Sequence, residues 1–419
     1  SPAKNKAMWL PENFMKIFSL SRPGAEVATY TAAGTVRRAL EYAGFETRKI
    51  RGFGRKRERL SARRPGEWQP AKTTTDSISI IGSGLAGFFC AEALSKRGVN
   101  FTIIDSGIPG PSNIPQLAVM PQVALKSEPK YRFSFAACQY MQSVPGYKKT
   151  GVLHERQTYE EIERLLKIAA QFPNEIIEFV NNKMIMFEAG WLAFEETKRH
   201  IPIQTHRAKI TSIRQEDQWL CLSGEKIIAS SDKLVLATGF DTKLLPEELE
   251  VRTIGGHAVS VKTKSQNQVI NNGVTVFPTY KGRSVISGTY EREPKKKIDP
   301  ILIDSLMKTA KKISEFDEKT AEPWLGRRTA ARDRFPIVGQ APCWEELKKA
   351  SSISRVNLYQ QGLYYCTAFG SRGATHARLA AEHLVSKMLG EPAAVGLKEQ
   401  KLMSPFRFTI RNRKPIHLI

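Results

Sequence analysis

Apolar and polar positions alternate from the start of the chain in patterns that predict a short series of α and β elements. Residues 12–20 and 36–43 have the spacing of amphipathic helices, and Gly44 stands where the second helix should end. Residues 27–31 and 45–50, which flank that helix, are rich in strand-forming side chains. This β-α-β order predicts the end of an α/β sheet, and the segment has no glycine-rich phosphate loop of its own.

The densest basic run of the chain follows the second strand. It includes Arg51, Arg55, Lys56, Arg57 and Arg59. Phe53 lies between two glycines in this run, and basic residues around an aromatic side chain are typical of a surface that binds nucleic acid. Residues 63–70 then combine two prolines with a glycine, which predicts a linker. We therefore expect a basic, partial α/β segment over residues 1–64 and a linker over residues 65–75.

A glycine-rich turn between a strand and a helix comes next. Residues 77–81 form a short apolar strand, residues 82–87 read Gly-Ser-Gly-Leu-Ala-Gly, and a second strand over residues 99–104 ends at Asp105. This is the full context of a dinucleotide-binding turn, in which the glycines admit a pyrophosphate at the helix N-terminus and the acid accepts hydrogen bonds from ribose. The cofactor-binding residues predicted here are Gly82, Gly84, Leu85, Ala86, Gly87 and Asp105.

Two later segments have features of the same fold. Residues 234–239 predict a buried parallel strand that ends at a glycine. Residues 363–368 predict another strand, followed by a glycine turn at residues 370–373 and a helix with an apolar face over residues 377–388. Backbone N–H groups at such a helix N-terminus can bind an electron-rich group. The cofactor-binding residues predicted in these segments are Gly239, Gly370, Ser371, Arg372 and Gly373.

Charge is the main functional clue in the composition. The 419 residues include 64 Lys and Arg against 41 Asp and Glu, and residues 1–75 alone hold 16 basic and 6 acidic residues. The resulting net charge of +23 favours polyanion partners, above all nucleic acid. A hydrophobic content of 41% excludes a largely disordered chain, and the absence of a long apolar run predicts a cytosolic protein. The scattered cysteines and histidines predict reduced core thiols and no metal site.

Several motifs resemble one known family. Residues 326–339 read GRRTAARDRFPIVG and residues 368–373 read AFGSRG, and both are similar to the flavin domain of the bifunctional tRNA wobble-uridine enzymes called MnmC. Gly-Trp-Leu at residues 190–192 also fits this domain. The opening Ser-Pro-Ala-Lys-Asn and the segment GFGRKRE at residues 52–58 resemble the last third of the methyltransferase domain in the same family. The resemblance covers nearly the whole chain.

The resemblance implies FAD as the cofactor, tRNA as the substrate and a defined reaction. Hydride leaves the carbon between the amine and the carboxylate of a carboxymethylaminomethyl group on the wobble uridine, and hydrolysis then releases glyoxylate. The resemblance also implies that Arg328 holds the substrate carboxylate, a bidentate task that suits a guanidinium, and that Arg372 contacts flavin or phosphate. Structural roles stay open for both, because Arg328 could form an ion-pair cluster with Arg332 and Asp333 and Arg372 could cap its turn.

One loop departs from the family pattern. Residues 110–121 keep Gln116, which is expected to bind the cofactor, but have Ile114 and Leu117 where the family has Asn and Gly. Three functions therefore stay open: the tRNA-modifying flavoenzyme, which we prefer, an amino-acid oxidase that acts on a free small molecule, and a tRNA-binding protein with a degenerate flavin site. The basic N-terminal run disfavours the second. Methylation by this chain alone is not expected, because the methyl-donor loop of the family lies before the first residue.

The expected fold class is α/β: an FAD-binding, Rossmann-like domain with an interleaved α+β substrate domain, preceded by the remnant of a methyltransferase domain. The oxidoreductase should span residues 76–395, and a basic C-terminal tail should follow over residues 396–419. Its FAD-binding segments are expected near residues 76–125, 190–245 and 322–395, and its substrate segments near residues 126–189 and 246–321.

Overall fold

The chain folds into two compact units, Ser1–Thr74 and Thr75–Ile419. The structure is a computed structural model. It describes residues 2–52, 57–67, 76–126, 128–263, 266–349 and 358–410.

The N-terminal unit is a three-stranded antiparallel sheet with helices packed on it. Its elements are η1 (Lys6–Trp9), α1 (Pro11–Leu20), β1 (Glu26–Ala28), α2 (Gly34–Tyr42), β2 (Glu46–Arg51) and β3 (Glu58–Arg63). The strand order is β1-β3-β2, and buried Phe14, Leu40 and Leu60 join the helices to the sheet. The structure confirms the predicted helices and the first two strands. It adds β3, which the sequence pattern did not predict because arginines dominate that segment.

A six-stranded sheet forms the centre of the larger unit. In spatial order its strands are β12 (Thr205–Arg207), β5 (Phe101–Asp105), β4 (Ile78–Ile81), β16 (Lys233–Leu236), β23 (Tyr359–Thr367) and β22 (Ile337–Pro342). The first five strands are parallel, and β22 pairs antiparallel with β23 at the edge. The predicted buried parallel strand is confirmed as β16, which lies between β4 and β23. Parallel strands with buried faces and short connections to helices are typical of a dinucleotide-binding fold.

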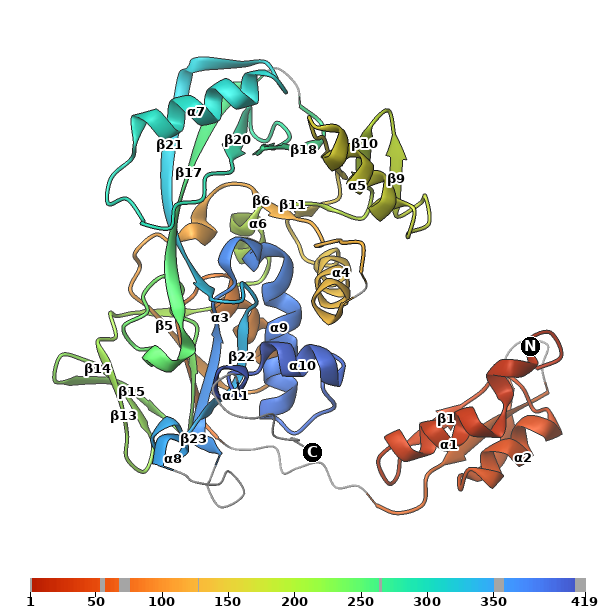
Figure 1. Cartoon of the computed structure of the whole chain (residues 1–419). Coiled ribbons are helices and arrows are strands. Elements are labelled where there is room, and N and C mark those ends of the chain that lie inside the picture. The colour runs from red at the N-terminus through yellow and green to blue at the C-terminus, as the bar shows by residue number, and fades with distance from the viewer. Residues whose placement is uncertain are drawn as a thin grey trace. The chain divides into compact units, whose positions relative to one another are not determined.

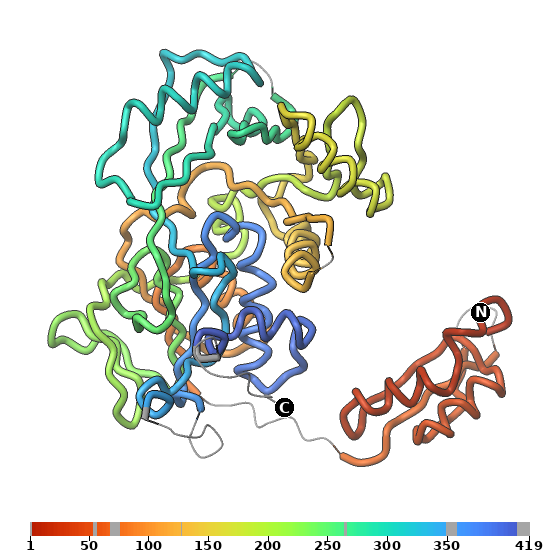
Figure 2. The backbone as a smooth tube through the Cα atoms, viewed as in Figure 1, coloured from red at the N-terminus to blue at the C-terminus, as the bar shows by residue number. Residues whose placement is uncertain are grey.

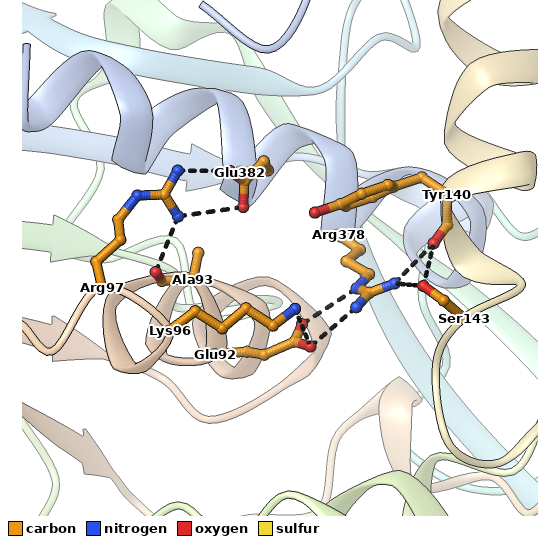
Figure 3. A network of polar contacts seen from close by, with 8 residues as sticks. All are labelled: Glu92, Ala93, Lys96, Arg97, Tyr140, Ser143, Arg378 and Glu382. Atoms are coloured by element: carbon orange, nitrogen blue, oxygen red, sulfur yellow. Dashed lines mark hydrogen bonds and ion pairs between the residues drawn. The ribbon is translucent and has the colours of Figure 1, made fainter. Parts of the chain in front are cut away.

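Helices α3 (Leu85–Ser95) and α9 (Gly373–Met388) pack beside this sheet and are joined by a buried ion pair. The Arg378 guanidinium donates to both Glu92 carboxylate oxygens at 3.0 and 3.2 Å. It also donates to the carbonyl of Tyr140 and the hydroxyl of Ser143, each at 2.7 Å (Figure 3). Burial alone would raise the pKa of Glu92, but the hydrogen bonds from Arg378 and Lys96 outweigh burial and hold that pKa below its usual value. The network ties α3 and α9 to the end of the neighbouring helix α4 (Pro129–Met141).

A second, eight-stranded sheet forms the other half of the larger unit (Figure 1). In spatial order it consists of β21 (Phe316–Ala331), β17 (Val251–Thr263), β20 (Arg283–Ser287), β19 (Val274–Val276), β18 (Val269–Asn272), β8 (Val152–His154), β10 (Lys183–Met186) and β9 (Ile177–Val180). Helix α7 (Pro300–Lys311) packs on the strands at one end, and α5 (Tyr159–Ala169) packs on those at the other. The chain enters this sheet twice, first in the yellow and later in the green-to-cyan part of the trace (Figure 2). Interleaving of this kind is what the sequence predicts.

Shorter elements lie between the strands of the two large sheets along the chain. They are η2 (Pro111–Asn113), β6 (Leu117–Val119), β7 (Tyr147–Lys148), β11 (Gly190–Leu192), α6 (Phe194–His200), β13 (Ser212–Gln215), β14 (Trp219–Ser223), β15 (Lys226–Ser231), η3 (Glu247–Leu249), α8 (Trp344–Lys349) and η5 (Gly370–Arg372). Strands β6, β11 and β7 form one three-stranded sheet, and β13, β14 and β15 form another. In the described part of the chain, no helix is long and apolar enough to cross a membrane.

The first part of the predicted basic C-terminal tail is folded. It contains α10 (Leu397–Met403) and α11 (Arg407–Ile410). Met403 and Phe408 are buried in the larger unit. The Arg407 guanidinium also forms an ion pair with Asp333 at 2.8 Å. Apolar side chains among the basic ones therefore anchor this segment to the fold.

Candidate active site

A cavity of about 960 Å³ opens at the carboxyl ends of β4, β5, β16 and β23 and continues along β17 and β21. Both glycine turns predicted from the sequence line it, as do the loop after Asp105 and the strand residues Gly256 and Arg328. The carboxyl ends of parallel strands are the usual ligand-binding edge of an open α/β sheet. The fold thus brings together residues that are more than 280 positions apart in the sequence.

The first glycine turn leaves room for a ligand to approach the backbone. Gly82 has φ +104°, and an added Cβ would lie 2.3 Å from the carbonyl oxygen of Ala237. An added Cβ at Gly87 would lie 1.8 Å from the Gly82 carbonyl oxygen, so Gly87 serves close packing of helix on strand and does not itself line the cavity. Gly84 and Leu85 do line it, at the N-terminus of α3, where the positive end of the helix dipole attracts an anion.

Asp105 lies at the cavity at the end of β5. Its carboxylate accepts hydrogen bonds from the backbone N–H groups of Ser83 at 2.7 Å and Gly107 at 2.6 Å. These contacts fix the carboxylate between the two loops. Because an ionised carboxylate has about four acceptor positions, lone pairs remain for a further donor such as a ribose hydroxyl.

The second glycine turn also lines the cavity. Ala368 and Gly370 have positive φ values of +62° and +57°, and together they turn the chain from β23 into α9. Thr238 and Thr367 also line the cavity, and neither buried hydroxyl has a hydrogen-bond partner within the described residues. Unpaired buried hydroxyls are costly unless a ligand or water satisfies them. Glycine cradles together with unsatisfied hydroxyls fit a bound dinucleotide.

Arg328 reaches the cavity from β21. Its Nη2 donates to the carbonyl oxygens of Thr289 at 3.1 Å and Gly255 at 3.3 Å. Burial lowers the pKa of Arg328, and the carboxylate of Glu291 acts in the opposite direction. Among the residues that the structure describes, no carboxylate lies within ion-pair distance of Arg328, and no acceptor is found for its Nε and Nη1 donors. The side chain therefore offers a partly buried cation with free donors to a ligand in the cavity.

The structure separates Arg328 from the ion-pair cluster that the sequence left open. Arg332 is exposed and pairs with Glu250 at 3.3 Å, and Asp333 pairs with Arg407. Neither Arg332 nor Asp333 lines the cavity. The proposed cluster of Arg328, Arg332 and Asp333 is therefore wrong, and of the three only Arg328 faces the candidate site.

The other predicted residues divide into two groups. Arg372, Gly239 and Ser371 line the cavity, and burial lowers the pKa of Arg372 to about 10. The Arg372 guanidinium has no hydrogen-bond or ion-pair partner within the described ranges. Gln116 also lines the cavity, but both ends of its amide are occupied, since Nε2 donates to the Pro278 carbonyl at 2.8 Å and Oε1 accepts from the Val285 N–H at 2.9 Å. Such contacts give Gln116 a structural task at the cavity wall.

The predicted tRNA-binding residues lie in the N-terminal unit. Arg51 ends β2, Arg57 precedes β3, and Arg59 lies within β3. Arg51 and Arg57 are exposed, and Arg59 is half-buried. Arg55 and Lys56 lie outside the described residues. Across the described residues of both units, no group of three or more His, Cys, Asp or Glu side chains is placed so that it could hold a metal ion.

The sequence analysis missed a buried histidine at the cavity. His257 of β17 lies between Glu291, whose Oε1 is 2.7 Å from its Nδ1, and the Asp299 N–H, which donates to its Nε2 at 3.0 Å. The pair Gly255-Gly256 just before it was the available signal, because glycines inside a strand often mark a close approach of other groups. An added Cβ at Gly256 would lie 2.4 Å from Nη2 of Arg328.

Comparisons with known proteins agree with this arrangement. Residues 1–65 match a family of S-adenosyl-L-methionine-dependent methyltransferases, residues 203–387 a family of FAD dependent oxidoreductases, and residues 80–110 an NAD(P)-binding Rossmann-like domain. Two bifunctional proteins named for tRNA 5-methylaminomethyl-2-thiouridine biosynthesis, MnmC of Cupriavidus necator and of Maricaulis maris, are 27% and 28% identical to the chain. The matches cover 98% and 99% of the chain, and 73% and 69% of the relatives.

The chain is an MnmC-like protein. It joins part of a methyltransferase domain to an FAD-dependent oxidoreductase, and its cofactor is FAD. Solved structures with the same fold include iminodiacetate oxidase from a Chelativorans species, with a TM-score of 0.61 and 17% identity over 78% of this chain and 99% of that one. Glycine oxidase from Bacillus cereus has a TM-score of 0.56 and 18% identity over 75% and 95% of the two chains. The glycine turns, Asp105 and the unpaired threonine hydroxyls are the residues that would hold FAD.

Proposed function

We propose that this oxidoreductase removes the carboxymethyl group from 5-carboxymethylaminomethyluridine, or its 2-thio form, at the wobble position of tRNA. The products would be the aminomethyl uridine and glyoxylate. Matches to proteins named for tRNA 5-methylaminomethyl-2-thiouridine biosynthesis, over 97–99% of this chain, support the proposal. Proteins that act on tRNA work where tRNA is found, so we also propose a cytoplasmic location.

The observation that carries the proposal is the unpaired guanidinium of Arg328 at the cavity. The substrate differs from its product by a carboxylate, and a planar guanidinium with free donors binds a carboxylate in a bidentate manner. Gly256 leaves space for the guanidinium, and the Gly255 and Thr289 carbonyls fix its orientation. Arg328 would thus hold the carboxylate so that the adjacent carbon faces the cofactor.

Bound FAD would supply the redox chemistry by accepting hydride from that carbon. The C–H bond breaks, the amine nitrogen forms a double bond to the same carbon, and water hydrolyses the resulting imine to a primary amine and glyoxylate. The residues of this chain would position the substrate, and Arg328 would supply the positive charge that binds its carboxylate. Both ring nitrogens of His257 have partners, Glu291 and the Asp299 N–H, so no proton-transfer role is assigned to this histidine.

A direct test uses purified protein and tRNA that carries carboxymethylaminomethyl uridine. Nucleoside mass spectrometry should show a loss of the carboxymethyl group, and an independent assay should show one glyoxylate for each nucleoside converted. Oxidation of glycine or another free amine without any change in the tRNA would replace the proposal by a small-molecule oxidase. Binding of tRNA by a protein that takes up no FAD would indicate the degenerate flavin site.

A further inference from the structure

A basic loop lies beside the cavity and leads into the N-terminus of α7. We call residues 289–299, which connect β20 to α7, the basic loop (Figure 1). Its exposed cations are Arg292, Lys295, Lys296 and Lys297, against one exposed acid, Glu293. Lys295 lies 4.0 Å from Asp299, whereas Arg292, Lys296 and Lys297 have no ion-pair partner within the described residues. The chain therefore leaves most of this positive charge available to an outside partner.

Both ends of the basic loop are fixed to the strand that lines the cavity. Glu291 and Gly255 exchange two backbone hydrogen bonds at 2.9 and 3.1 Å. At the other end, the Asp299 N–H donates to Nε2 of His257, and Nδ1 of the same ring lies 2.7 Å from Oε1 of Glu291. Lys297 is two residues from Asp299, a distance of at most about 7 Å along the chain. The buried histidine thus holds the lysines close to the cavity.

An aromatic side chain stands where the basic loop meets the cavity. Tyr290 lines the cavity and is 51% exposed. The guanidinium of Arg334, which is itself exposed, lies 5.8 Å from the centroid of the tyrosine ring. Aromatic rings and arginine planes are the groups on which proteins stack the unpaired bases of single-stranded RNA. The half-exposed ring of Tyr290 is thus suited to stacking on a base.

We propose that Tyr290 and the basic loop form a docking site for single-stranded RNA at the mouth of the cavity. Tyr290 stacks on a base next to the reacting nucleotide, and the lysines with Arg292 contact the backbone phosphates. This inference rests on the proposed function, because the wobble position lies in a single-stranded loop whose bases can be splayed out. A free amino acid would need neither a stacking surface nor a row of cations.

A charge-matched pair of variants tests the lysines. The loop variant is Lys295→Ala, Lys296→Ala and Lys297→Ala, and the control variant is Lys308→Ala, Lys311→Ala and Lys312→Ala. The control removes the same charge at the far end of α7. For binding to an unmodified tRNA transcript, the loop variant should lower the slope of log affinity against log salt by about 2, at ~0.7 for each phosphate that a lysine no longer neutralises. In turnover, KM should rise while kcat stays near the wild-type value. The control should keep the wild-type slope and KM.

Two substitutions test the stacking residue. Tyr290→Leu should lower kcat/KM for tRNA by about 5- to 150-fold, the range expected for loss of one stacked base, while Tyr290→Phe keeps the ring and should stay close to wild type. Equal flavin content and equal Tm would show that the variants are folded. A wild-type salt slope in the loop variant, or wild-type kcat/KM in Tyr290→Leu, would overturn the docking site. If wild-type protein binds tRNA but does not oxidise it, the proposed function is wrong, and the salt slopes still decide the docking site.

Discussion

Replacement of Arg328 by alanine is the most informative perturbation of the candidate site. The side chain donates to two backbone carbonyls through one nitrogen only, and its remaining N–H donors have no acceptor among the described residues. A guanidinium held in this way is positioned by the fold but not neutralised by it. Arg328→Ala should therefore weaken carboxylate binding while it leaves the FAD-binding turns unchanged.

The size of the effect follows from the interactions that the substitution removes. A charge-assisted pair in a partly dry site contributes roughly 1.5 to 3 kcal/mol, which corresponds to about 10- to 150-fold in kcat/KM. Removal of the hydrogen bonds to the Thr289 and Gly255 carbonyls should lower the free energy of unfolding by only about 1 to 2 kcal/mol, because the Gly255 carbonyl keeps a bond from the Glu291 N–H. Activity should thus fall far more than stability.

The assay is steady-state oxidation of carboxymethylaminomethyl-uridine tRNA, with flavin absorbance and Tm measured on the same samples. Arg328→Lys should recover only part of the activity, since an ammonium cannot form the bidentate contact. Gly256→Ala offers a second route, because its Cβ would displace the guanidinium without removing the charge. Arg332→Ala, which removes an exposed arginine paired with Glu250, is the matched control and should behave as wild type. Near-normal turnover in a stable Arg328→Ala protein would refute the carboxylate role and direct attention to Arg372.

Three further predictions concern the cofactor, the buried ion pair and pH. Gly82→Ala should lose FAD absorbance because its Cβ would meet the Ala237 carbonyl, whereas Gly98→Ala, which also has a positive φ but no atom within 4 Å, should keep the flavin. Glu92→Gln should lower the free energy of unfolding by about 3 kcal/mol in chemical denaturation, because it leaves a buried arginine without its charge partner. Burial lowers the pKa of His376 to about 3, whereas in the unfolded chain this pKa is about 6.5. Between these two pH values the unfolded state binds a proton that the folded state does not bind, so the free energy of unfolding should fall as pH decreases from about 6.5 toward 3. The variant His376→Gln should lose less stability than wild type between about pH 6 and pH 4. An identical pH dependence in the two proteins would show that His376 is not the source of the loss of stability at low pH.

The sequence by itself determined the parts of the protein whose structure depends on neighbours in the chain. The strand–turn–helix unit that begins at Gly82 was predictable because the positive φ, the helix N-terminus and Asp105 all lie within about 25 residues. The second glycine turn was predictable for the same reason. Strand β3 was not predicted because Arg59 and Arg63 make the segment look polar. Only the folded sheet shows that Leu60 and Ala62 are buried.

Tertiary structure alone decided which polar residues meet at the cavity. Arg328 and Arg332 are four residues apart, but pairing of β21 with β17 places the first opposite Ile254 beside the cavity, and the turn after Ala331 directs the second to the surface. His257 lies in β17, and Glu291 and Asp299 lie near the two ends of the basic loop; they meet only because β17 and the basic loop are hydrogen-bonded to each other. Local periodicity determines which face of a strand a residue occupies. It carries no information on strand partners tens of residues away, because side-chain packing and hydrogen bonding across the sheet select them.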